Sequence, residues 1–115
     1  MRALVFALGL ALTAIPAVAE TIQPSDAPKH IGEIVTVEGT VNEVHTDARS
    51  GATFINMGGS FPNQAFTGVI FKDDAGKFPN VHSLTAGVVA ITGRMQEYKG
   101  RAEIILNDPA QLKEK

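Results

Sequence analysis

Hydrophobic and polar residues alternate along several short segments of the chain, with the two-residue period of half-buried β-strands. The longest of these, residues 34–45, alternates Val35, Val37 and Val41 with polar side chains and carries Gly39 in its middle. An isolated glycine inside a long strand usually marks a bulge or bend that lets one strand serve two sheets. Shorter segments of the same kind follow at residues 52–57, 66–72, 88–98 and 102–106.

One connection between these segments has the spacing of a short helix. Phe78, Val81 and Leu84 recur every three residues, which gives one apolar face to a helical turn or two. The order of three strands, a short helix and two strands predicts an all-β protein. It is typical of the OB-fold, a five-stranded Greek-key barrel with one short helix between strands 3 and 4. An antiparallel sandwich is the alternative, although that architecture generally needs about seven strands.

The same alternation predicts which side chains point into the barrel. The chain has no cysteine, so disulfides cannot contribute and an apolar core has to supply the stability. The inward positions are expected to be Val35, Val37, Val41, Ile55, Val69, Val89, Ile91, Ile104 and Leu106.

The first 19 residues have a different pattern from the rest. Arg2 precedes an apolar run at residues 3–14, and Ala17 and Ala19 fit the small-residue rule of a signal-peptidase site. The run is too short to span a hydrocarbon core of about 30 Å. We therefore expect residues 1–19 to be a secretory signal peptide, with no membrane insertion, and the mature protein to be periplasmic or secreted.

The remainder divides into three parts. Residues 20–30 are polar, contain Pro24 and Pro28 and show no periodicity, so we expect a flexible leader. Residues 31–112 hold all the predicted strands and form the OB-fold domain. Residues 113–115 are expected to be a C-terminal tail.

The charge balance limits the classes of partner. The whole chain has a net charge of −2, and loss of Arg2 with the signal peptide makes it one unit more negative. Sequence-independent phosphate binding needs clustered Lys and Arg, so this balance argues against a dedicated polycation such as a histone-like protein. A local basic patch stays compatible with it.

Catalytic and metal-binding motifs are missing from the sequence. It contains no GxSxG, P-loop or GxGxxG motif. His30, His45 and His82 lie far apart without an HExxH or CxxC partner, which favours loop histidines over a metal site. We therefore expect no enzyme, no cofactor and no metal.

Basic and aromatic residues near the last turn are the strongest binding candidates. OB barrels bind ligands on the outer face of strands 2 and 3 and on the adjoining loops, where aromatic rings stack bases and Lys or Arg hold phosphates. Tyr98, Lys99 and Arg101 cluster at the turn, and Arg94 lies four residues before Tyr98, which places both on one strand face. The alternative is a solvated hairpin whose charges keep the protein soluble and protect a strand edge.

Three further residues extend this candidate site. Arg49 and Lys72 are expected to border it from other loops, and Phe61 stands between Ser60 and Pro62 in a turn. Phe61 is therefore the phenylalanine we expect to be exposed, while most other aromatic rings belong to the core.

Five motifs occur in order along the chain: TFINMG at residues 53–58, FPNQAFTGVI at 61–70, TGR at 92–94, EYKGRAEI at 97–104 and PAQ at 109–111. In this combination the sequence resembles a bacterial family of OB-fold nucleic-acid-binding domains. Such domains are similar to the accessory modules found beside nuclease domains in secreted DNases, and they also occur alone. The resemblance covers nearly all of the chain after residue 19 and implies single-stranded nucleic acid as the ligand.

These observations together predict a non-catalytic, exported OB-fold protein that binds single-stranded nucleic acid weakly. The alternative is a periplasmic protein-binding or stress-related OB module without a nucleic-acid ligand, which the negative charge fits at least as well. Oligosaccharide binding is a third use of the fold. One Tyr and no Trp leave little of the usual platform for stacking sugars.

Overall fold

The computed structural model describes residues 19–115 and is organised around one long strand, β2 (Ile34–Thr46). The first part of β2 pairs antiparallel with β5 (Val88–Arg94), and the second part pairs antiparallel with β3 (Thr53–Met57). The register shifts between Val41 and Glu43, so one strand does serve two sheets, but the irregularity lies after Gly39. The predicted signal peptide, residues 1–19, lies outside the described residues except for Ala19.

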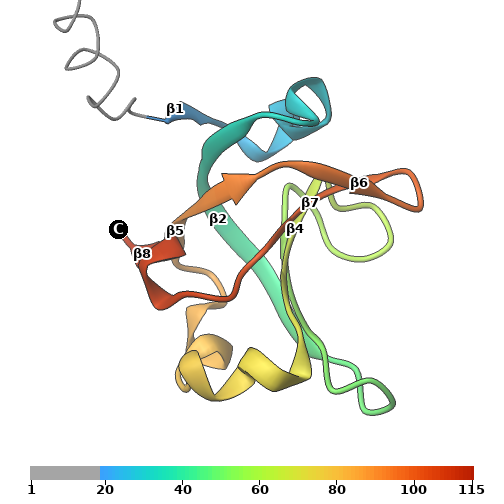
Figure 1. Cartoon of the computed structure of the whole chain (residues 1–115), viewed down its shortest axis with the longest axis vertical. Coiled ribbons are helices and arrows are strands. Elements are labelled where there is room, and N and C mark those ends of the chain that lie inside the picture. Colours follow the sequence, from blue (N-terminus) through green and yellow to red (C-terminus); the bar gives the residue numbers. More distant parts are fainter. Residues whose placement is uncertain (1–18) are drawn as a thin grey trace, which may run out of the picture.

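The remaining strands close the sheet into a barrel (Figure 1). β3 pairs with β4 (Phe66–Ile70), β4 runs parallel to β7 (Arg101–Ile105), and β6 (Gln96–Tyr98) forms a hairpin with β7. The strand order is β6-β7-β4-β3-β2-β5-β8. Only Met95 separates β5 from β6 in the chain, so β5, on one side of this order, continues into β6 at its opposite end, and β5 also contacts β7. This arrangement confirms the predicted all-β OB-fold, but with eight strands instead of five, because the predicted fourth strand is divided into β5 and β6 and the short strands β1 and β8 are added.

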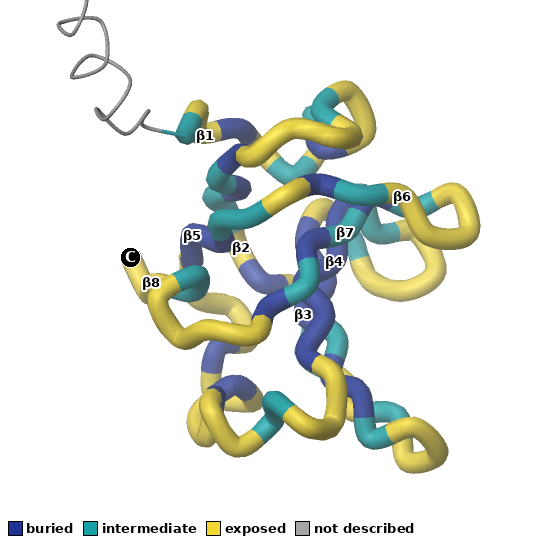
Figure 2. The backbone as a smooth tube through the Cα atoms, in the orientation of Figure 1, coloured by how far each residue is buried: buried dark blue, intermediate teal, exposed yellow. Residues whose placement is uncertain are grey.

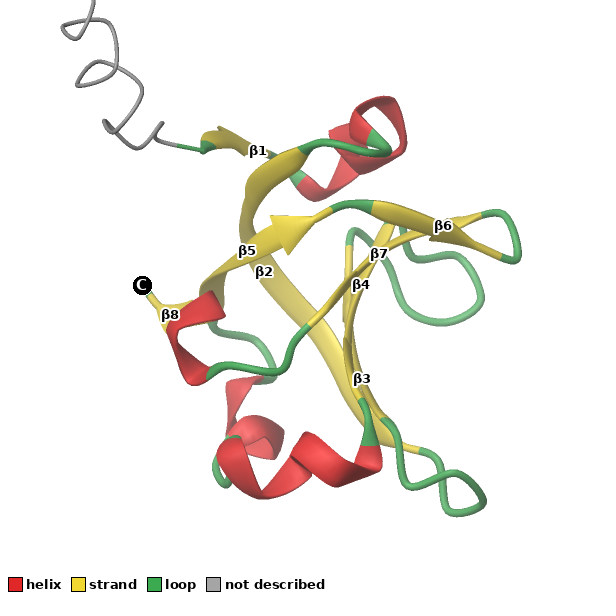
Figure 3. Cartoon of the chain, in the orientation of Figure 1, coloured by secondary structure: helices red, strands yellow, loops and turns green. Residues whose placement is uncertain are grey.

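Short 3-10 helices, not one helix, occupy the connection between β4 and β5 (Figure 3). They are η2 (Lys72–Lys77) and η3 (Val81–Leu84), and η3 buries the two apolar residues at its ends. Within residues 19–115, no helix is long and apolar enough to cross a membrane.

Both ends of the described chain differ from prediction. Residues 20–30 are folded instead of forming a flexible leader: β1 (Glu20–Ile22) runs parallel to β2, and η1 (Pro24–His30) follows it. Ile22 and Ala27 are buried in the core, and these two isolated contacts leave no periodic signal in the sequence. Residues 113–115 are not a free tail, because β8 (Leu112–Glu114) pairs with β5 after the short helix η4 (Pro109–Gln111).

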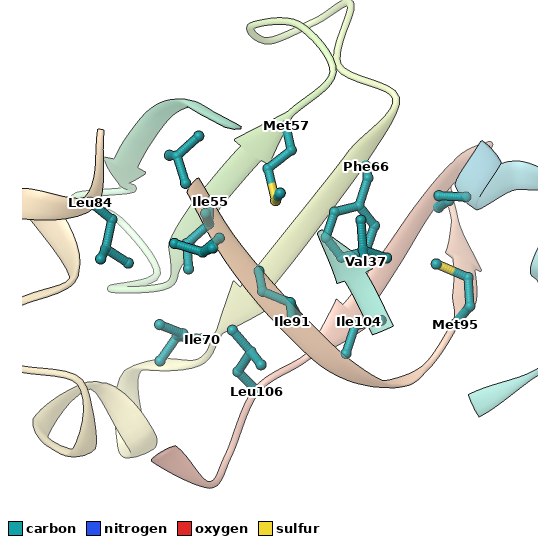
Figure 4. Packing of buried hydrophobic residues seen from close by; sticks show 14 of the residues in the cluster. Val37, Ile55, Met57, Phe66, Ile70, Leu84, Ile91, Met95, Ile104 and Leu106 are labelled. Atoms are coloured by element: carbon teal, nitrogen blue, oxygen red, sulfur yellow. The ribbon is translucent and has the colours of Figure 1, made fainter. Parts of the chain in front are cut away.

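The core fills the barrel along its length (Figures 2 and 4). All nine residues predicted to point inward are buried, but Val69 is not part of the core cluster. A Cβ on Gly68 would lie 3.0 Å from Cδ1 of Ile91, so Gly68 faces the core and Val69 faces outward opposite Phe54 on β3. The apolar and polar residues of β4 alternate imperfectly, so the sequence pattern did not show that Gly68 points inward.

Candidate nucleic-acid interface

A groove of about 530 Å³ crosses the outer face of β2, β3, β4 and β7. Figure 1 shows the β6–β7 hairpin beside the loop that joins β3 to β4, and these two segments border the groove. The strands contribute side chains from alternate positions, which all point to the same face. The lining residues are Glu43, His45, Asp47, Phe54, Asn56, Phe61, Gln64, Thr67, Tyr98, Lys99, Arg101 and Glu103.

Four of the predicted site residues meet in this groove. The guanidinium carbon of Arg101 lies 4.9 Å from the ring centre of Phe61, and Nζ of Lys99 lies 5.3 Å from the ring centre of Tyr98. Phe61 is 63% exposed, as predicted, and Tyr98 is 56% exposed. Each ring therefore lies against a cation and keeps much of its surface open to solvent.

Arg94 does not join this group. The prediction placed it on the same face as Tyr98 because four residues separate them. Buried Met95 interrupts the strand between β5 and β6, so the alternation does not continue across it. The Arg94 guanidinium instead donates a hydrogen bond of 2.6 Å to the carbonyl oxygen of Gly32. The predicted basic and aromatic site is therefore reduced here to the β6–β7 hairpin, without Arg94.

Arg49 and Lys72 also lie outside the groove lining. Arg49 is in the β2–β3 loop, close enough to Asp47 to favour its charged form. The aliphatic part of Lys72 packs against Gly51, which has a φ of +78°. Both cations border other parts of the surface.

A chain of hydrogen bonds between strands forms one wall of the groove, and the sequence had not indicated it. Asn56 Nδ2 donates to Glu43 Oε2 at 2.8 Å, Thr67 Oγ1 donates to Asn56 Oδ1 at 2.9 Å, and Gln64 Nε2 donates to Thr67 Oγ1 at 3.2 Å. An ionised carboxylate can only accept, so Glu43 sets the direction of the whole chain. No sequence signal marks the bonds of Asn56 with Glu43 and with Thr67, because each of them joins two different strands.

Glu43 also positions the aromatic loop. Its Oε2 accepts a hydrogen bond of 2.7 Å from the backbone N–H of Phe61, and Asn42 Oδ1 accepts one of 2.9 Å from Gly59 N–H. The bonds from Phe61 and from Asn56 hold the pKa of Glu43 below its usual value. The exposed ring of Phe61 is therefore held in place by a charged acceptor on β2.

The groove carries charges of both signs. Glu43, Asp47 and Glu103 bring three carboxylates, whereas Lys99 and Arg101 bring two cations. The cations lie together at the hairpin, so any phosphate would bind there. Glu43 and Glu103 lie on strands and Asp47 follows β2, and all three carboxylates disfavour a second row of phosphates.

Two of these carboxylates have shifted pKa values with different causes. Burial raises the pKa of Glu103, and the hydrogen bond of 2.7 Å from Gln96 Nε2 opposes that rise. The backbone N–H of Ser50 donates to Asp47 at 2.8 Å and lowers the pKa of Asp47. Glu103 is thus the groove carboxylate most easily protonated.

One cluster of potential metal ligands lies away from the groove. Ligand atoms of Glu20, His30 and Glu33 lie within 4.8 Å of one another. His30 Nδ1 and Glu33 Oε1 already form a hydrogen bond of 2.9 Å, which is the main cause of the raised pKa of His30. His30 at the end of η1 and Glu33 just before β2 therefore form an ion pair when the imidazole is protonated.

Comparisons with known proteins identify the fold. No protein-family model matches the sequence, and no curated protein matches it. An OBody bound to hen egg-white lysozyme is structurally similar, with 18% identity, a TM-score of 0.62 and coverage of 88% of this chain and 98% of that one. A protein assigned as an aspartyl-tRNA synthetase from Leishmania major has 8% identity and a TM-score of 0.56. That match covers 89% of this chain, which spans only 22% of the larger protein.

Proposed function

We propose that this protein is a non-catalytic binding module that holds single-stranded nucleic acid weakly in the groove. The observation that carries the proposal is the convergence of three aromatic rings, Phe54, Phe61 and Tyr98, with the cations Lys99 and Arg101. Stacking of a base on an aromatic ring contributes about 1–3 kcal/mol and tolerates any base. Cations beside such rings neutralise the phosphates between the stacked bases.

The position of the groove supports the same ligand class. In an OB-fold, oligonucleotides bind on the outer face of the second and third strands of the barrel and on the loops that flank it. Here those strands are β3 and β4, and the β6–β7 turn corresponds to one of the flanking loops. The rings and cations are therefore on the face that the fold uses for this purpose.

The charges of the groove predict weak binding that salt readily abolishes. Two phosphate contacts, at Lys99 and Arg101, correspond to a slope of log affinity against log salt of about −1.4 for a single strand. The three carboxylates of the groove repel further phosphates. Binding should therefore be measurable mainly at low salt.

Fluorescence anisotropy with a labelled oligodeoxynucleotide at several salt concentrations tests the proposal. Tyr98→Ala should lower the affinity and leave the slope unchanged, whereas Arg101→Ala should make the slope shallower by about 0.7. Arg94→Ala is the matched control, because Arg94 lies outside the groove lining, and both affinity and slope should stay as in the parent. Absence of binding at low salt by protein with an intact thermal transition would refute a nucleic-acid ligand.

A protein partner is the second candidate, and the carboxylates favour it. Glu43, Asp47 and Glu103 give the groove a charge pattern that a mixed-charge protein surface can complement. Exposed Phe61 and Tyr98 are residue types enriched in protein interfaces. This candidate takes precedence if the anisotropy experiment gives no binding.

We further propose that the protein is exported and belongs to the family of OB-fold domains that its motifs resemble. The signal-peptide pattern of residues 1–19 supports export. β1 begins at Glu20, so cleavage after Ala19 would leave every described strand intact. Mass spectrometry of protein expressed from the full-length gene should find Glu20 at the mature N-terminus, and retention of residues 1–19 would contradict export.

A further inference from the structure

We propose that Glu20, His30 and Glu33 form a binding site for a divalent transition-metal ion such as Zn²⁺. The three residues belong to β1, to the end of η1 and to the turn before β2. Their ligand atoms lie within 4.8 Å of one another, and none of the three lines the groove. The proposed site is therefore independent of the groove and of the function proposed for it.

The fold brings these three residues together from separate segments. β1 runs parallel to β2 with Glu20 opposite Val35, so Glu20 is placed beside the start of β2 and near Glu33. η1 connects β1 to the turn before β2 and ends at His30. No ligand motif marks the site in the sequence, because Glu20 joins it through strand pairing and not through spacing along the chain.

Two carboxylates converge on one imidazole at this site. His30 Nδ1 and Glu33 Oε1 are 2.9 Å apart. A carboxylate oxygen of Glu20 comes within 4.8 Å of the ligand atoms of both. When the imidazole is neutral, two negative charges remain close together and repel each other. A cation bound between them replaces this repulsion with attraction.

The basic side chains of the same region do not supply that cation. Lys29 Nζ pairs with Asp26 Oδ1 at 3.5 Å, and the Arg94 guanidinium donates to the carbonyl oxygen of Gly32 at 2.6 Å. Among residues 19–115, neither of these cations forms an ion pair with a carboxylate of the site. The imidazole of His30 is thus the sole partner in an ion pair there.

The donor set selects the class of ion. One imidazole nitrogen and two carboxylate oxygens are ligands that Zn²⁺ binds at about 2.0–2.2 Å, and three protein ligands leave a fourth position for water. Mg²⁺ and Ca²⁺ prefer sites built from oxygen alone. An imidazole nitrogen therefore favours a transition metal over these two ions.

Small side-chain movements complete the coordination geometry. Ligand atoms on one tetrahedral zinc lie about 3.4 Å apart, so the carboxylates have to move by about 1 Å. The Glu33 side chain is 55% exposed and Glu20 is also exposed, which leaves room for this movement. The His30 side chain is only 18% exposed and provides the fixed ligand.

A bound ion would join β1 and the end of η1 to the beginning of β2. The segment of residues 20–30 has Ile22 and Ala27 in the core, so an ion adds a third connection to the barrel. A ligand that binds only the folded protein raises Tm by mass action. Metal binding requires a deprotonated imidazole, so in acid the ion pair of His30 with Glu33 replaces it.

Isothermal titration calorimetry with zinc chloride at pH 7.5 tests the site, using untagged protein expressed from the full-length gene. The parent should bind one zinc ion per chain, and zinc should raise Tm, with EDTA reversing the increase. Mg²⁺ at the same concentration should do neither. Cleavage after Ala19 would retain all three ligands, so the test applies to the processed protein as well.

Three variants assign the ligands. His30→Gln and Glu20→Gln should each lower the zinc affinity by at least about tenfold, because loss of a residue that only orients a ligand already costs about 10–100-fold. His45→Gln is the matched control, since it removes an imidazole that lines the groove and should leave the zinc affinity unchanged. In ¹H–¹⁵N spectra of the parent, zinc should shift amide signals at residues 20–22 and 30–35.

Each remaining outcome overturns the proposal. Absence of zinc binding by folded parent protein at micromolar zinc excludes the site. Parent-like affinity in His30→Gln or in Glu20→Gln excludes this set of ligands. Loss of affinity in His45→Gln, or zinc-dependent shifts confined to the groove, would place the ion elsewhere. None of these results alters the test of nucleic-acid binding, so the two proposals fail separately.

Discussion

Replacement of Gly93 by alanine should force apart the two strands that close the barrel, β5 and β7. A Cβ on Gly93 would lie 2.6 Å from Cγ2 of Ile104 and 3.1 Å from Nε2 of Gln111. Ile104 is fully buried, so its methyl group has no free space to enter. The Gln111 amide donates to the carbonyl oxygens of Thr92 and Ile105 at 3.1 Å each, so it is also held in place.

The size of the effect follows from these contacts. Overpacking of a filled core costs about 1–3 kcal/mol, and the restriction that alanine imposes on the unfolded chain returns about 0.4–1 kcal/mol. The net loss for Gly93→Ala is therefore about 1–2 kcal/mol. For a domain of this size each kcal/mol lowers Tm by about 4–8 °C, so we expect a decrease of about 4–16 °C.

Three further variants separate the clash from a general effect of removing a glycine. Gly76 has no atom within 4 Å of a built Cβ and no positive φ, so Gly76→Ala should leave Tm unchanged or slightly higher. Ile104→Ala alone leaves a cavity and should cost about 2–5 kcal/mol. Combined with Gly93→Ala it removes the clashing methyl group, so the double variant should be more stable than the sum of the single losses.

Thermal and urea unfolding followed by circular dichroism measure all four variants. A Gly93→Ala protein that melts within about 2 °C of the parent would show that β5 and β7 do not approach as described. If the stability losses of the two single variants simply added in the double variant, the contact between position 93 and Ile104 would also be contradicted. β7 carries Arg101 and Glu103, so a loosened closure should also weaken ligand binding in the groove.

Three further predictions concern stability. Ile91→Ala should cost about 2–5 kcal/mol in urea unfolding, because Ile91 is fully buried in the core; an unchanged midpoint would mean that its strand register is wrong. Glu43→Gln should lower Tm at pH 7, because the hydrogen bond from Phe61 N–H lowers the pKa of Glu43 and so stabilises the fold at pH values above the ordinary pKa of 4.5. The difference in Tm from the parent should disappear as acid protonates the carboxylate. A difference in Tm that does not change with pH would contradict this. His30 should show the opposite pH dependence, because its pKa is raised, mainly by the hydrogen bond with Glu33. His30→Gln should lower Tm at pH 5.5, which is below the ordinary pKa of 6.5, and the difference in Tm should disappear as the pH rises through the folded-state pKa. An equal decrease in Tm at pH 9 would exclude the ion pair as the cause.

Local patterns were sufficient for most of the architecture. Alternation located the strands and assigned residues such as Val37 and Ile91 to the core, because side-chain direction within one strand depends only on its two-residue period. Alternation gave the wrong direction for Val69, because the residue that faces the core there is Gly68, which leaves no apolar signal. It also missed the folding of residues 20–30, whose two buried side chains contact a barrel built from later segments.

Patterns along the chain were enough to predict the OB-fold order of strands, the exposure of Phe61 and the basic and aromatic turn at residues 98–101. These features depend on neighbours in the chain. Which distant residues share the groove became known only from the folded barrel. Glu43 reaches Asn56 across 13 positions and Phe61 across 18, and Arg94 turns away because the strand is interrupted at Met95. Pairing register and the interruption of a strand arise from packing of the whole barrel, so a pattern read along one strand cannot contain them.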